Sequence, residues 1–405
     1  MVELLAPAGN LSSFNSALKN GADSIYVGLV GSNMRDNASN FHVRDLKDLV
    51  DTSHDHDKML YLCTNTIMKD RDLEEFEIIL PEVNSYEVDA LIVGDLGLVD
   101  MAIENNLEVH MSVQANVTNI NTLKILKRLG VSRAILSREL SFHEVRNIAK
   151  NSPIETEVFV HGAMCMGISG RCFLSYDLYG ESANCGKCLQ PCRKDWKLTR
   201  ANDEENNDIE EIILEKSYDR TNFLSAKDLT MIEHIPELME SGVEGFKIEG
   251  RGRSPDYVAT TTRVFRDAID HYNLSREKEE TYKFNPEWLS DLKKVFHRGF
   301  DTGFYFNQPY EISEDNTATH RKKDIGKVVN YYNQIKVGEL QLWDDLNLFD
   351  EIIIQGSTTG SIDHIVESME INGKAIQKAE KGKNVAIAIE DKIRKNDHVY
   401  KLIKV

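Results

Sequence analysis

Five of the six cysteines in the sequence lie within one short segment of the chain. Their spacing is C-x6-C, then a loop, then C-x2-C-x3-C, formed by Cys165, Cys172, Cys185, Cys188 and Cys192. Thiolates are soft ligands, and four of them suit either a tetrahedral zinc ion or an iron–sulfur cluster. A single catalytic thiol is a third interpretation, which the presence of five neighbouring cysteines disfavours.

The spacing within this segment favours a cluster over zinc. Zinc sites usually bring two tight C-x2-4-C pairs, whereas six residues separate the first pair here. Four glycines would let the backbone wrap closely around a bulky group, namely Gly162, Gly167, Gly170 and Gly186. We expect Cys165, Cys172, Cys188 and Cys192 to be the ligands, with Cys185 as a fifth candidate that could replace one of them.

Arginine side chains form a second group that could do chemistry. Arginine binds carboxylate or phosphate with two parallel hydrogen bonds, so several arginines near one site indicate an anionic ligand. We expect Arg138, Arg251 and Arg253 to bind it, although ion pairs with the surplus of Asp and Glu would explain any one of them equally well. His161 and Glu249 are the candidates for proton transfer, and a structural role for His161 is an equal alternative.

The elements that must position these residues alternate between short apolar runs and helical patterns up to about residue 272. This alternation predicts parallel βα units and a (β/α)8 barrel. The eight expected strands are Glu3–Ala6, Ser24–Gly28, Met59–Cys63, Ala90–Val93, Val109–Val113, Arg133–Leu136, Glu157–Val160 and Gly245–Ile248. The expected helices include Leu11–Lys19, Leu73–Val83, Leu96–Asn105, Asn121–Leu129, Phe142–Lys150, Thr230–Ser241 and Pro255–His271.

A barrel collects its functional residues where the strands end. Asn65 and Gln114 follow expected strands in the same way as Arg138, His161 and Glu249 do. We therefore expect Asn65 and Gln114 to contact substrate as well.

The rest of the chain divides around this barrel. We predict a catalytic barrel over residues 1–272, which contains a cysteine-rich insertion over the barrel mouth at 163–222. A helical connection follows at 273–321. Short β runs split by turns then predict a small closed β-barrel at 322–405.

Composition narrows the class of protein. The 405 residues are 41% hydrophobic and carry a net charge of −18, which predicts a folded chain of two or three domains and argues against wholesale wrapping of nucleic acid. A local basic patch remains compatible with that charge. Because the sequence has no apolar leader or membrane span, we expect a cytoplasmic protein, in which clustered cysteines bind metal instead of forming disulfides.

The cysteine segment resembles a known family signature. The run Glu157-x-Phe159-x2-Gly162-Ala163-Met164-Cys165-x4-Gly170-x-Cys172-x-Leu174-Ser175 is similar to that of the collagenase-like peptidases of unclassified (U-class) catalytic type. The resemblance extends over the whole chain, to residues 3–10, 182–184, 191–193, 225–229, 246–251 and 297–300. It is strongest toward the branch of prephenate-dependent tRNA uridine hydroxylases.

The resemblance implies an iron–sulfur enzyme, with a 4Fe–4S cluster, that hydroxylates an RNA base without molecular oxygen. The implied substrate is the tRNA wobble uridine, converted to 5-hydroxyuridine, with prephenate as co-substrate. Prephenate is a dicarboxylate, which would explain the arginines. A collagenase-like peptidase is the first alternative, although the sequence has no His-Glu-x-x-His zinc motif. A non-catalytic iron–sulfur partner subunit, as in quinone-modifying relatives, is the second.

Two further features bear on this resemblance. Relatives often carry a cysteine directly after Lys-Asp-Leu, and in some it is a cluster ligand, but here Thr230 follows Lys227-Asp228-Leu229. This departure leaves the fourth ligand open and draws attention to Cys185. In the C-terminal region, residues 325–330, 349–352, 366–369 and 396–400 resemble the second-domain barrel of translation elongation factors, which favours an RNA substrate over a quinone.

Overall fold

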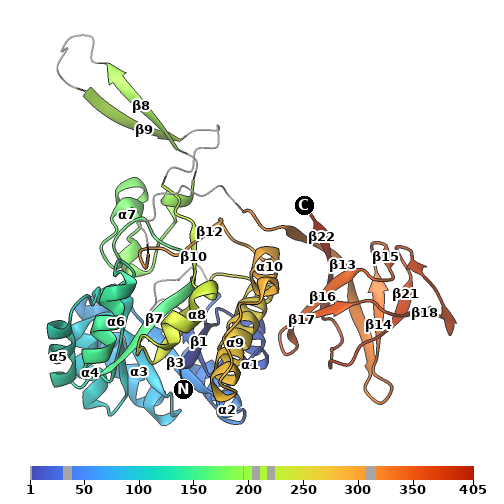
Figure 1. Cartoon of the computed structure of the whole chain (residues 1–405), viewed down its shortest axis with the longest axis horizontal. Helices are drawn as coiled ribbons and strands as arrows, with labels where there is room; N and C mark the ends of the chain where they lie inside the picture. The colour runs from blue at the N-terminus through green and yellow to red at the C-terminus, as the bar shows by residue number, and fades with distance from the viewer. Residues whose placement is uncertain (1, 31–38, 195, 203–209, 217–223, 307–315) are drawn as a thin grey trace.

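The computed structural model describes residues 2–30, 39–194, 196–202, 210–216, 224–306 and 316–405. Figure 1 shows an α/β barrel on the left, a hairpin above it and a separate group of β-strands on the right. The hairpin consists of β8 (Trp196–Asn202) and β9 (Glu210–Lys216). Residues 203–209 and 217–222 of the predicted insertion lie outside the described residues.

Eight parallel strands form a closed barrel, as predicted. Their neighbour order is β1-β2-β3-β4-β5-β6-β7-β11, and β11 pairs with both β1 and β7 to complete the circle. The strands are β1 (Glu3–Pro7), β2 (Ser24–Gly28), β3 (Met59–Thr64), β4 (Ala90–Val93), β5 (Val109–Met111), β6 (Arg133–Ile135), β7 (Glu155–Gly162) and β11 (Gly245–Ile248). Every residue of β1, β2, β4 and β11 is buried, because the helices cover the outer face and side chains fill the interior.

The helices form the outer ring of this barrel (Figure 1). They are α1 (Leu11–Lys19), α2 (Leu46–His54), α3 (Asp70–Ser85), α4 (Leu96–Glu104), α5 (Ile120–Arg128), α6 (Phe142–Asn151), α8 (Ile235–Met239) and α9 (Pro255–Glu277). Several begin at a side chain that accepts a hydrogen bond from the first turn, such as Asn10, Asp95 and Ser141. Among the described helices, none combines the length and the apolar character that crossing a bilayer requires.

The helix predicted at Thr230–Ser241 is wrong in its first half. Thr230 ends a short strand, β10 (Asp228–Thr230), which pairs antiparallel with the end of β7 and places Thr230 opposite His161. The α-helix begins only at Ile235. Pro236 lies in its first turn, where the missing N–H of proline costs no helical hydrogen bond. The apolar residues of this segment recur with helical spacing, which is why the sequence predicts a helix from Thr230, where the strand β10 ends.

The segment after α9 packs onto the barrel. It contains α10 (Pro286–Lys294) and β12 (Phe300–Asp301), and β12 pairs with β10. Trp288, Leu292 and Tyr305 belong to the same buried hydrophobic cluster as the barrel strands.

The C-terminal region is antiparallel β structure around a core of its own. The order of its main sheet is β17-β16-β22-β13-β14-β21-β18-β19, and the described pairings do not join β17 to β19. Ile325, Leu340 and Val399 lie in its separate core. The strands are β13 (His320–Tyr332), β14 (Val337–Leu342), β16 (Glu351–Gly356), β17 (Gly360–Ile365), β18 (Met369–Ile371), β19 (Lys374–Ala375), β21 (Asn384–Ala388) and β22 (His398–Lys404), with a small pair β15 (Leu346–Asn347) and β20 (Lys378–Ala379) beside them.

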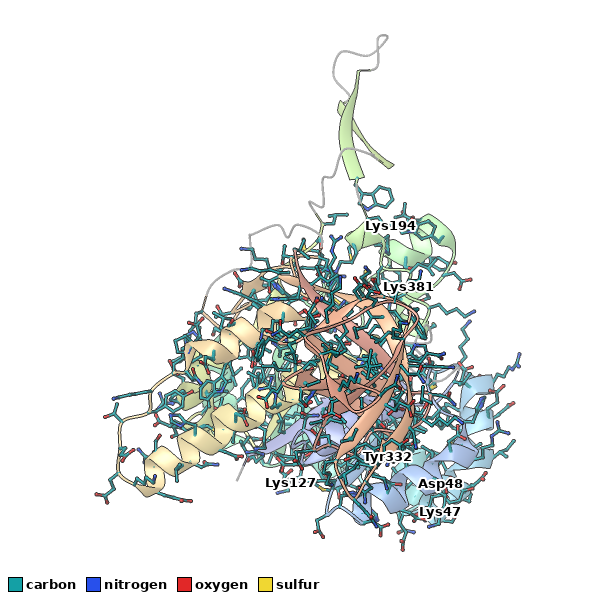
Figure 2. All side chains as sticks on the ribbon, turned by 90° about the vertical axis from the view of Figure 1, so that its right-hand side faces the viewer. Lys47, Asp48, Lys127, Lys194, Tyr332 and Lys381 are labelled. Atoms are coloured by element: carbon teal, nitrogen blue, oxygen red, sulfur yellow. The ribbon has the colours of Figure 1, made fainter. Side chains whose placement is uncertain are left out.

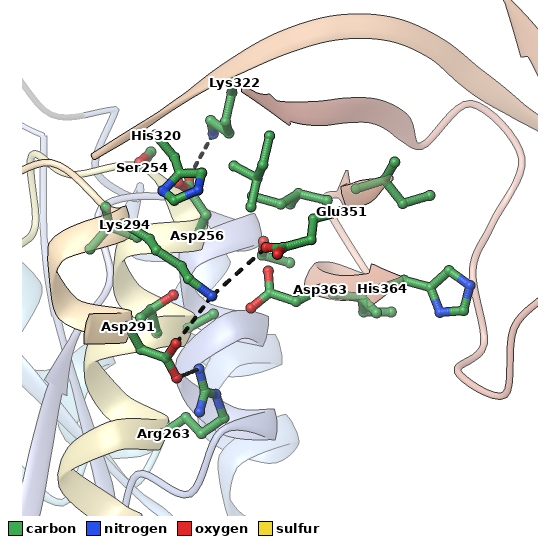
Figure 3. Close-up of a pocket in the computed structure, with 18 of the residues that line it drawn as sticks. Ser254, Asp256, Arg263, Asp291, Lys294, His320, Lys322, Glu351, Asp363 and His364 are labelled. Atoms are coloured by element: carbon green, nitrogen blue, oxygen red, sulfur yellow. Dashed lines mark hydrogen bonds and ion pairs between the residues drawn. The ribbon is translucent and has the colours of Figure 1, made fainter. Parts of the chain in front are cut away.

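A cavity of about 1200 Å³ separates this sheet from α9 and α10 (Figure 3). Ion pairs cross it: the Lys322 ammonium lies 2.6 Å from Asp256, and the Lys294 ammonium lies 3.8 Å from Glu351. Lys294 also pairs with Asp291 of its own helix at 3.3 Å. These paired charges connect the C-terminal sheet to the outer helices of the barrel.

Candidate active site at the barrel mouth

The cysteine segment follows β7 and lies over the ends of several barrel strands. The backbone N–H of Ile67, just after β3, donates a 3.0 Å hydrogen bond to the carbonyl of Asn184. The Arg138 guanidinium, which follows β6, donates to the Ala163 carbonyl at 3.0 Å and to the Ser169 hydroxyl at 3.2 Å. Contacts with loops that follow two different strands place the segment across the carboxyl-terminal mouth of the barrel.

Glycines allow the segment to approach the barrel closely. Gly162 has a φ of +113°, and a Cβ atom there would lie 2.5 Å from the Glu249 carbonyl oxygen. Gly170 has a φ of +72°, and a Cβ atom there would lie 2.4 Å from the Gln114 carbonyl oxygen. Both positions therefore require glycine for conformation and for space.

Four of the five clustered cysteines come together. Burial raises the pKa of the Cys192 thiol to about 11. The neighbouring Arg193 lowers this pKa, and the thiols of Cys165, Cys188 and Cys172 raise it further. Cys185, which is exposed, is not among these principal neighbours of Cys192. The four thiols that interact are the four predicted as ligands.

These thiols, which all lie within the described residues, do not form a preformed site for one metal ion. In the part of the chain that is described, no three His, Cys, Asp or Glu side chains lie close enough to hold one metal ion. A zinc ion would need its sulfur ligands about 2.3 Å away, whereas an iron–sulfur cluster spreads four thiolates over several metal atoms. The six cysteines lie outside disulfide bonds, so these thiols are available as ligands.

Three arginines lie near one another beside the cysteines, and two of them pair with one buried carboxylate. Asp228, which is 2% exposed, lies 3.7 Å from the Arg253 guanidinium and 3.5 Å from that of Arg298. Both guanidinium groups also lie over the ring of Phe296, at 4.0 and 4.8 Å from its centroid. Burial lowers the pKa of Arg298 to about 10, and Arg193 and Arg253 lower it as well, while Asp228 opposes them.

Arg193 joins this group to the cysteine segment. Its guanidinium donates to the Ser225 hydroxyl and to the Ala226 carbonyl, both at 2.7 Å, and to the Met164 carbonyl. Arg193, Arg253 and Arg298 are called the arginine triad below. Two of these positive charges face the Asp228 carboxylate and the third lies near Arg298, and an anionic ligand would compensate this excess of positive charge.

The sequence prediction included only part of the triad. Arg253 was selected as a ligand for the anion, whereas Arg298 and Asp228 were noted only within motifs of the family resemblance. Arg298 precedes Gly299 just before the short strand β12, and Arg251 and Arg253 likewise adjoin glycines after β11. Its distance of 45 residues from Arg253 hid their proximity, which arises because β12 pairs with β10.

The other predicted ligands of substrate lie elsewhere around the mouth. Arg138 anchors the cysteine segment and lies 5.3 Å from the centroid of the Phe159 ring. Arg251 is buried, with its guanidinium 5.7 Å from the centroid of the Tyr26 ring. The amide of Asn65 donates to the Ser112 hydroxyl at 3.3 Å, and Gln114 packs against Gly170. These residues therefore line the rim without joining the triad.

The two residues predicted to transfer protons lie in different surroundings. His161 is 2% exposed, and its ring contacts the rings of Tyr257, Phe265 and Phe300. Burial lowers the pKa of His161 to about 3, and the nearby His297 and Arg253 lower it too, so the ring is neutral at pH 7. Tyr257 and Phe265 belong to α9, so His161 packs between the barrel and this helix.

Glu249 lies where β11 ends. The Tyr26 hydroxyl lies 3.5 Å from its carboxylate, and the Tyr257 hydroxyl donates to its backbone carbonyl at 3.1 Å. Its side chain is half-buried, in contrast to His161.

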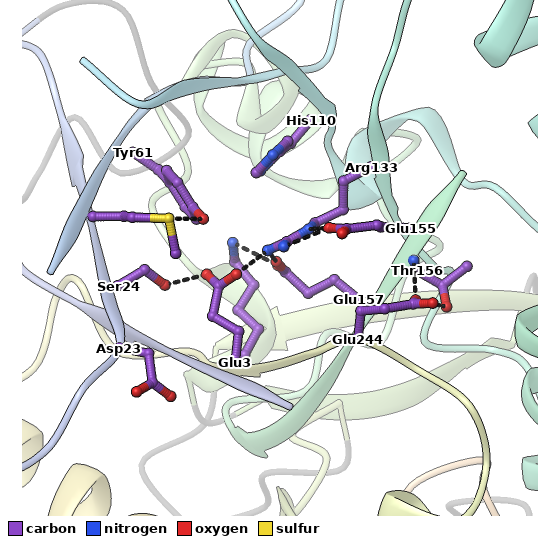
Figure 4. A network of polar contacts seen from close by, with 12 residues as sticks. Glu3, Asp23, Ser24, Tyr61, His110, Arg133, Glu155, Thr156, Glu157 and Glu244 are labelled. Carbon is purple, nitrogen blue, oxygen red and sulfur yellow. Dashed lines mark hydrogen bonds and ion pairs between the residues drawn. The ribbon is translucent and has the colours of Figure 1, made fainter. Parts of the chain in front are cut away.

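A second group of charged residues fills the opposite end of the barrel, where the strands begin (Figure 4). The Arg133 guanidinium lies 2.7 Å from Glu3, 2.6 Å from Glu155 and 3.5 Å from Glu157. The Lys247 ammonium lies 3.1 Å from Glu157. Burial alone would raise the pKa of Glu157, but Lys247 and Arg133 outweigh it and hold that pKa below its usual value. Acidic and basic groups are matched here.

Comparison with known proteins agrees with this architecture. The model of peptidase family U32 matches residues 9–315, which is most of the chain. The chain belongs to peptidase family U32. Both the cysteine segment and the arginine triad of this U32 chain lie within the matched residues.

Similar proteins carry names of two kinds. A protein of Methanocaldococcus jannaschii, named an uncharacterized protease, is 46% identical over 99% of this chain and 98% of its own length. A collagenase of Porphyromonas gingivalis is 34% identical over 99% of this chain and 98% of its own length. A tRNA hydroxylation protein of Bacillus subtilis is 33% identical over 91% of this chain and 86% of its own length. Names within the U32 family thus point to both peptidases and RNA hydroxylation.

Proposed function

We propose that this U32 chain is a cytoplasmic enzyme that hydroxylates a base in RNA without molecular oxygen. The proposed substrate is the tRNA wobble uridine, the proposed product is 5-hydroxyuridine, and the proposed donor is prephenate. Cys165, Cys172, Cys188 and Cys192 would hold a 4Fe–4S cluster. The observation that carries the proposal is the juxtaposition of the cysteine segment with three arginines at one barrel mouth. Arg193 hydrogen-bonds to the Met164 carbonyl beside Cys165, and Arg253 and Arg298 pair with Asp228.

The arginine triad would bind the dicarboxylate donor. Arg253 and Arg298 rest on Phe296 and are held by Asp228, so their planar donors are ordered before the ligand arrives. Arg193 hydrogen-bonds to the carbonyl of Met164, the residue before Cys165, and so couples the bound anion to the cysteine segment. When bound, the cluster would supply redox chemistry.

Glu249 is a better candidate for proton transfer than His161. A neutral histidine that burial holds at a pKa of about 3 cannot carry a proton at pH 7. It can still orient the backbone at the end of β7. Glu249, which is half-buried at the end of β11 and adjoins Gly162, has the access to solvent that a proton-transfer group needs.

The relative from Bacillus subtilis supports an RNA substrate, and the collagenase from Porphyromonas gingivalis supports the alternative of a peptidase. The two functions make different demands on the site. Peptide hydrolysis does not require four clustered thiols, and its activity would survive the removal of iron. A non-catalytic partner subunit would keep the cluster but would leave RNA unchanged by itself.

Mass spectrometry of tRNA nucleosides tests the proposal. A strain that lacks the gene should lose 5-hydroxyuridine and its derivatives from wobble positions, and the wild-type gene should restore them. The Cys188→Ser gene should not restore them. Unchanged nucleosides in the deletion strain would refute the proposed function, and collagen cleavage by iron-free protein would establish the peptidase instead.

A further inference from the structure

The outer face of the cysteine segment exposes a row of aromatic side chains. Phe173 directly precedes the short helix α7 (Leu174–Tyr179), and Phe173, Tyr176 and Tyr179 are 69%, 58% and 39% exposed. Their three-residue spacing puts them along one side of the helix. Ser175 is buried on the other side, where its hydroxyl accepts a 3.1 Å hydrogen bond from the N–H of Leu189. Phe173, Tyr176 and Tyr179 are called the aromatic face below.

Basic side chains accompany the aromatic face, although the whole chain carries a net charge of −18. Residues 163–194 contain two acidic residues, Asp177 and Glu181, against four basic ones, which are Arg171, Lys187, Arg193 and Lys194. The Lys194 ammonium lies 4.5 Å from the centroid of the Tyr179 ring and 3.2 Å from its hydroxyl. Figure 2 labels Lys194 beside α7, below the hairpin. Lys187 pairs with Glu181 at 3.6 Å, and residues 163–194 carry two more basic than acidic residues on an acidic protein.

We propose that the aromatic face binds an unpaired stretch of the RNA substrate. Bases would stack on Phe173, Tyr176 and Tyr179, and phosphates would lie against nearby Arg171, Lys187 and Lys194. Every base has a π-face, so such stacking tolerates any sequence. The proposed function supplies the class of substrate, RNA, on which this inference rests. The inference adds the surface of the protein that binds the RNA.

The position of the face supports this role. Phe173 adjoins Cys172, and Cys165 is exposed in the same segment. A base stacked here would therefore lie next to the thiols. Bases must be unstacked from their neighbours to reach aromatic side chains, so the bound stretch would be a loop and not a duplex.

The chemistry of the face favours RNA over a protein partner. Lysine is depleted in protein–protein interfaces, whereas aromatic residues with Lys and Arg among them are typical of surfaces that bind single strands. Here two lysines and two arginines, against two acidic residues, lie within the same 24 residues as the three aromatic rings.

Binding measurements on the full chain test the inference. The triple variant F173A/Y176A/Y179A would be compared with wild type for a fluorescent anticodon stem-loop RNA and for a duplex of matched length. We expect the affinity for the stem-loop to fall about fivefold or more for each lost stack. The double variant Y332A/F349A removes equally exposed aromatic rings from the C-terminal region and should bind as wild type does. Lys187→Gln and Lys194→Gln should each lower the dependence of log affinity on log salt by about 0.7.

Two results would overturn the inference: wild-type affinity in the triple variant, or equal binding of duplex and stem-loop. If the triple variant does not fold, Tyr176→Ala alone carries the test. The proposed function fails separately. A chain that binds the loop through the aromatic face but leaves wobble uridine unmodified would refute hydroxylation only.

Discussion

The two ends of the barrel are both lined with buried charges, but they differ in balance. At the end where strands begin, the two cations Arg133 and Lys247 each pair with at least one of the three carboxylates Glu3, Glu155 and Glu157, so every cation is matched by a partner. At the mouth, Arg253 and Arg298 share Asp228, and Arg193 lies near Arg298. Where every cation has an acidic partner within the protein, no ligand is needed to compensate its charge. The unmatched set leaves positive charge in a half-buried place, where an anion would compensate it.

This difference separates residues that stabilise the fold from residues that bind substrate. Removing one member of a buried ion pair destabilises the fold, because the remaining partner is left charged without compensation. Removing a charged group that binds a ligand should lower the stability of the fold less and the affinity for the ligand more. The predictions below test this distinction, from the largest expected effect to the smallest.

The matched end should respond to substitution with a loss of stability. Arg133→Met leaves Glu157, which is fully buried, with Lys247 as its remaining basic partner. We expect the free energy of unfolding to fall by about 3–5 kcal/mol. Urea denaturation followed by circular dichroism measures this change. The matched control is Arg298→Met at the mouth, and an equal loss of stability in both variants would erase the distinction.

His161 lies close to the mouth, yet its side chain is buried like most of the charged side chains at the matched end. Its pKa is lowered to about 3 in the folded protein, whereas an unfolded histidine titrates near 6.5. The unfolded chain therefore binds more protons in the window between these values, so stability is full above about pH 6.5 and falls as the pH drops through the window. The expected slope is about 1.4 kcal/mol per pH unit.

The variant His161→Phe should remove that component of the pH dependence between pH 6.5 and 5. His54→Phe, which alters an exposed histidine paired with Asp89, serves as the control and should keep it. Urea denaturation at both pH values measures the difference. An unchanged slope in His161→Phe would show that the ring is not held neutral by its surroundings.

The mouth should respond to substitution with a loss of binding. Arg298→Gln removes one charge of the arginine triad, and we expect the KM for the dicarboxylate donor to rise about tenfold or more, because charge-assisted hydrogen bonds contribute about 1.5–3 kcal/mol. The melting temperature should change little. Lys294→Gln, in the ion pairs beside the interdomain cavity, is the control. Steady-state kinetics with varied donor would contradict the account if both variants kept the wild-type KM.

The sequence predicted the barrel well because its signals are local. Strands such as Ser24–Gly28 and Ala90–Val93 are continuous apolar runs, and helices begin at capping residues such as Ser141. The start of the helix after β7 was wrong because the pairing of Thr230 with His161 depends on a partner 69 residues away. Nothing in the local pattern of residues 228–241 reveals that partner.

The candidate site was predicted only in part for the same reason. The cysteines lie close in sequence, so their grouping could be read directly. The arginine triad unites residues 193, 253 and 298, and it depends on the pairing of β10 with both β7 and β12. Likewise, His161 lies beside a register shift between β7 and β11, and no pattern in the sequence predicts that shift.

The central claim is that Cys165, Cys172, Cys188 and Cys192 hold an iron–sulfur cluster at the barrel mouth. The most direct test is the iron and sulfide content of anaerobically purified Cys188→Ser and Cys185→Ser. Cys188 interacts with Cys192, and Cys185 is not among its principal neighbours. We predict that Cys188→Ser loses most of its iron and sulfide while Cys185→Ser keeps the wild-type content. Loss in Cys185→Ser with retention in Cys188→Ser, or zinc in place of iron in the wild type, would contradict the account.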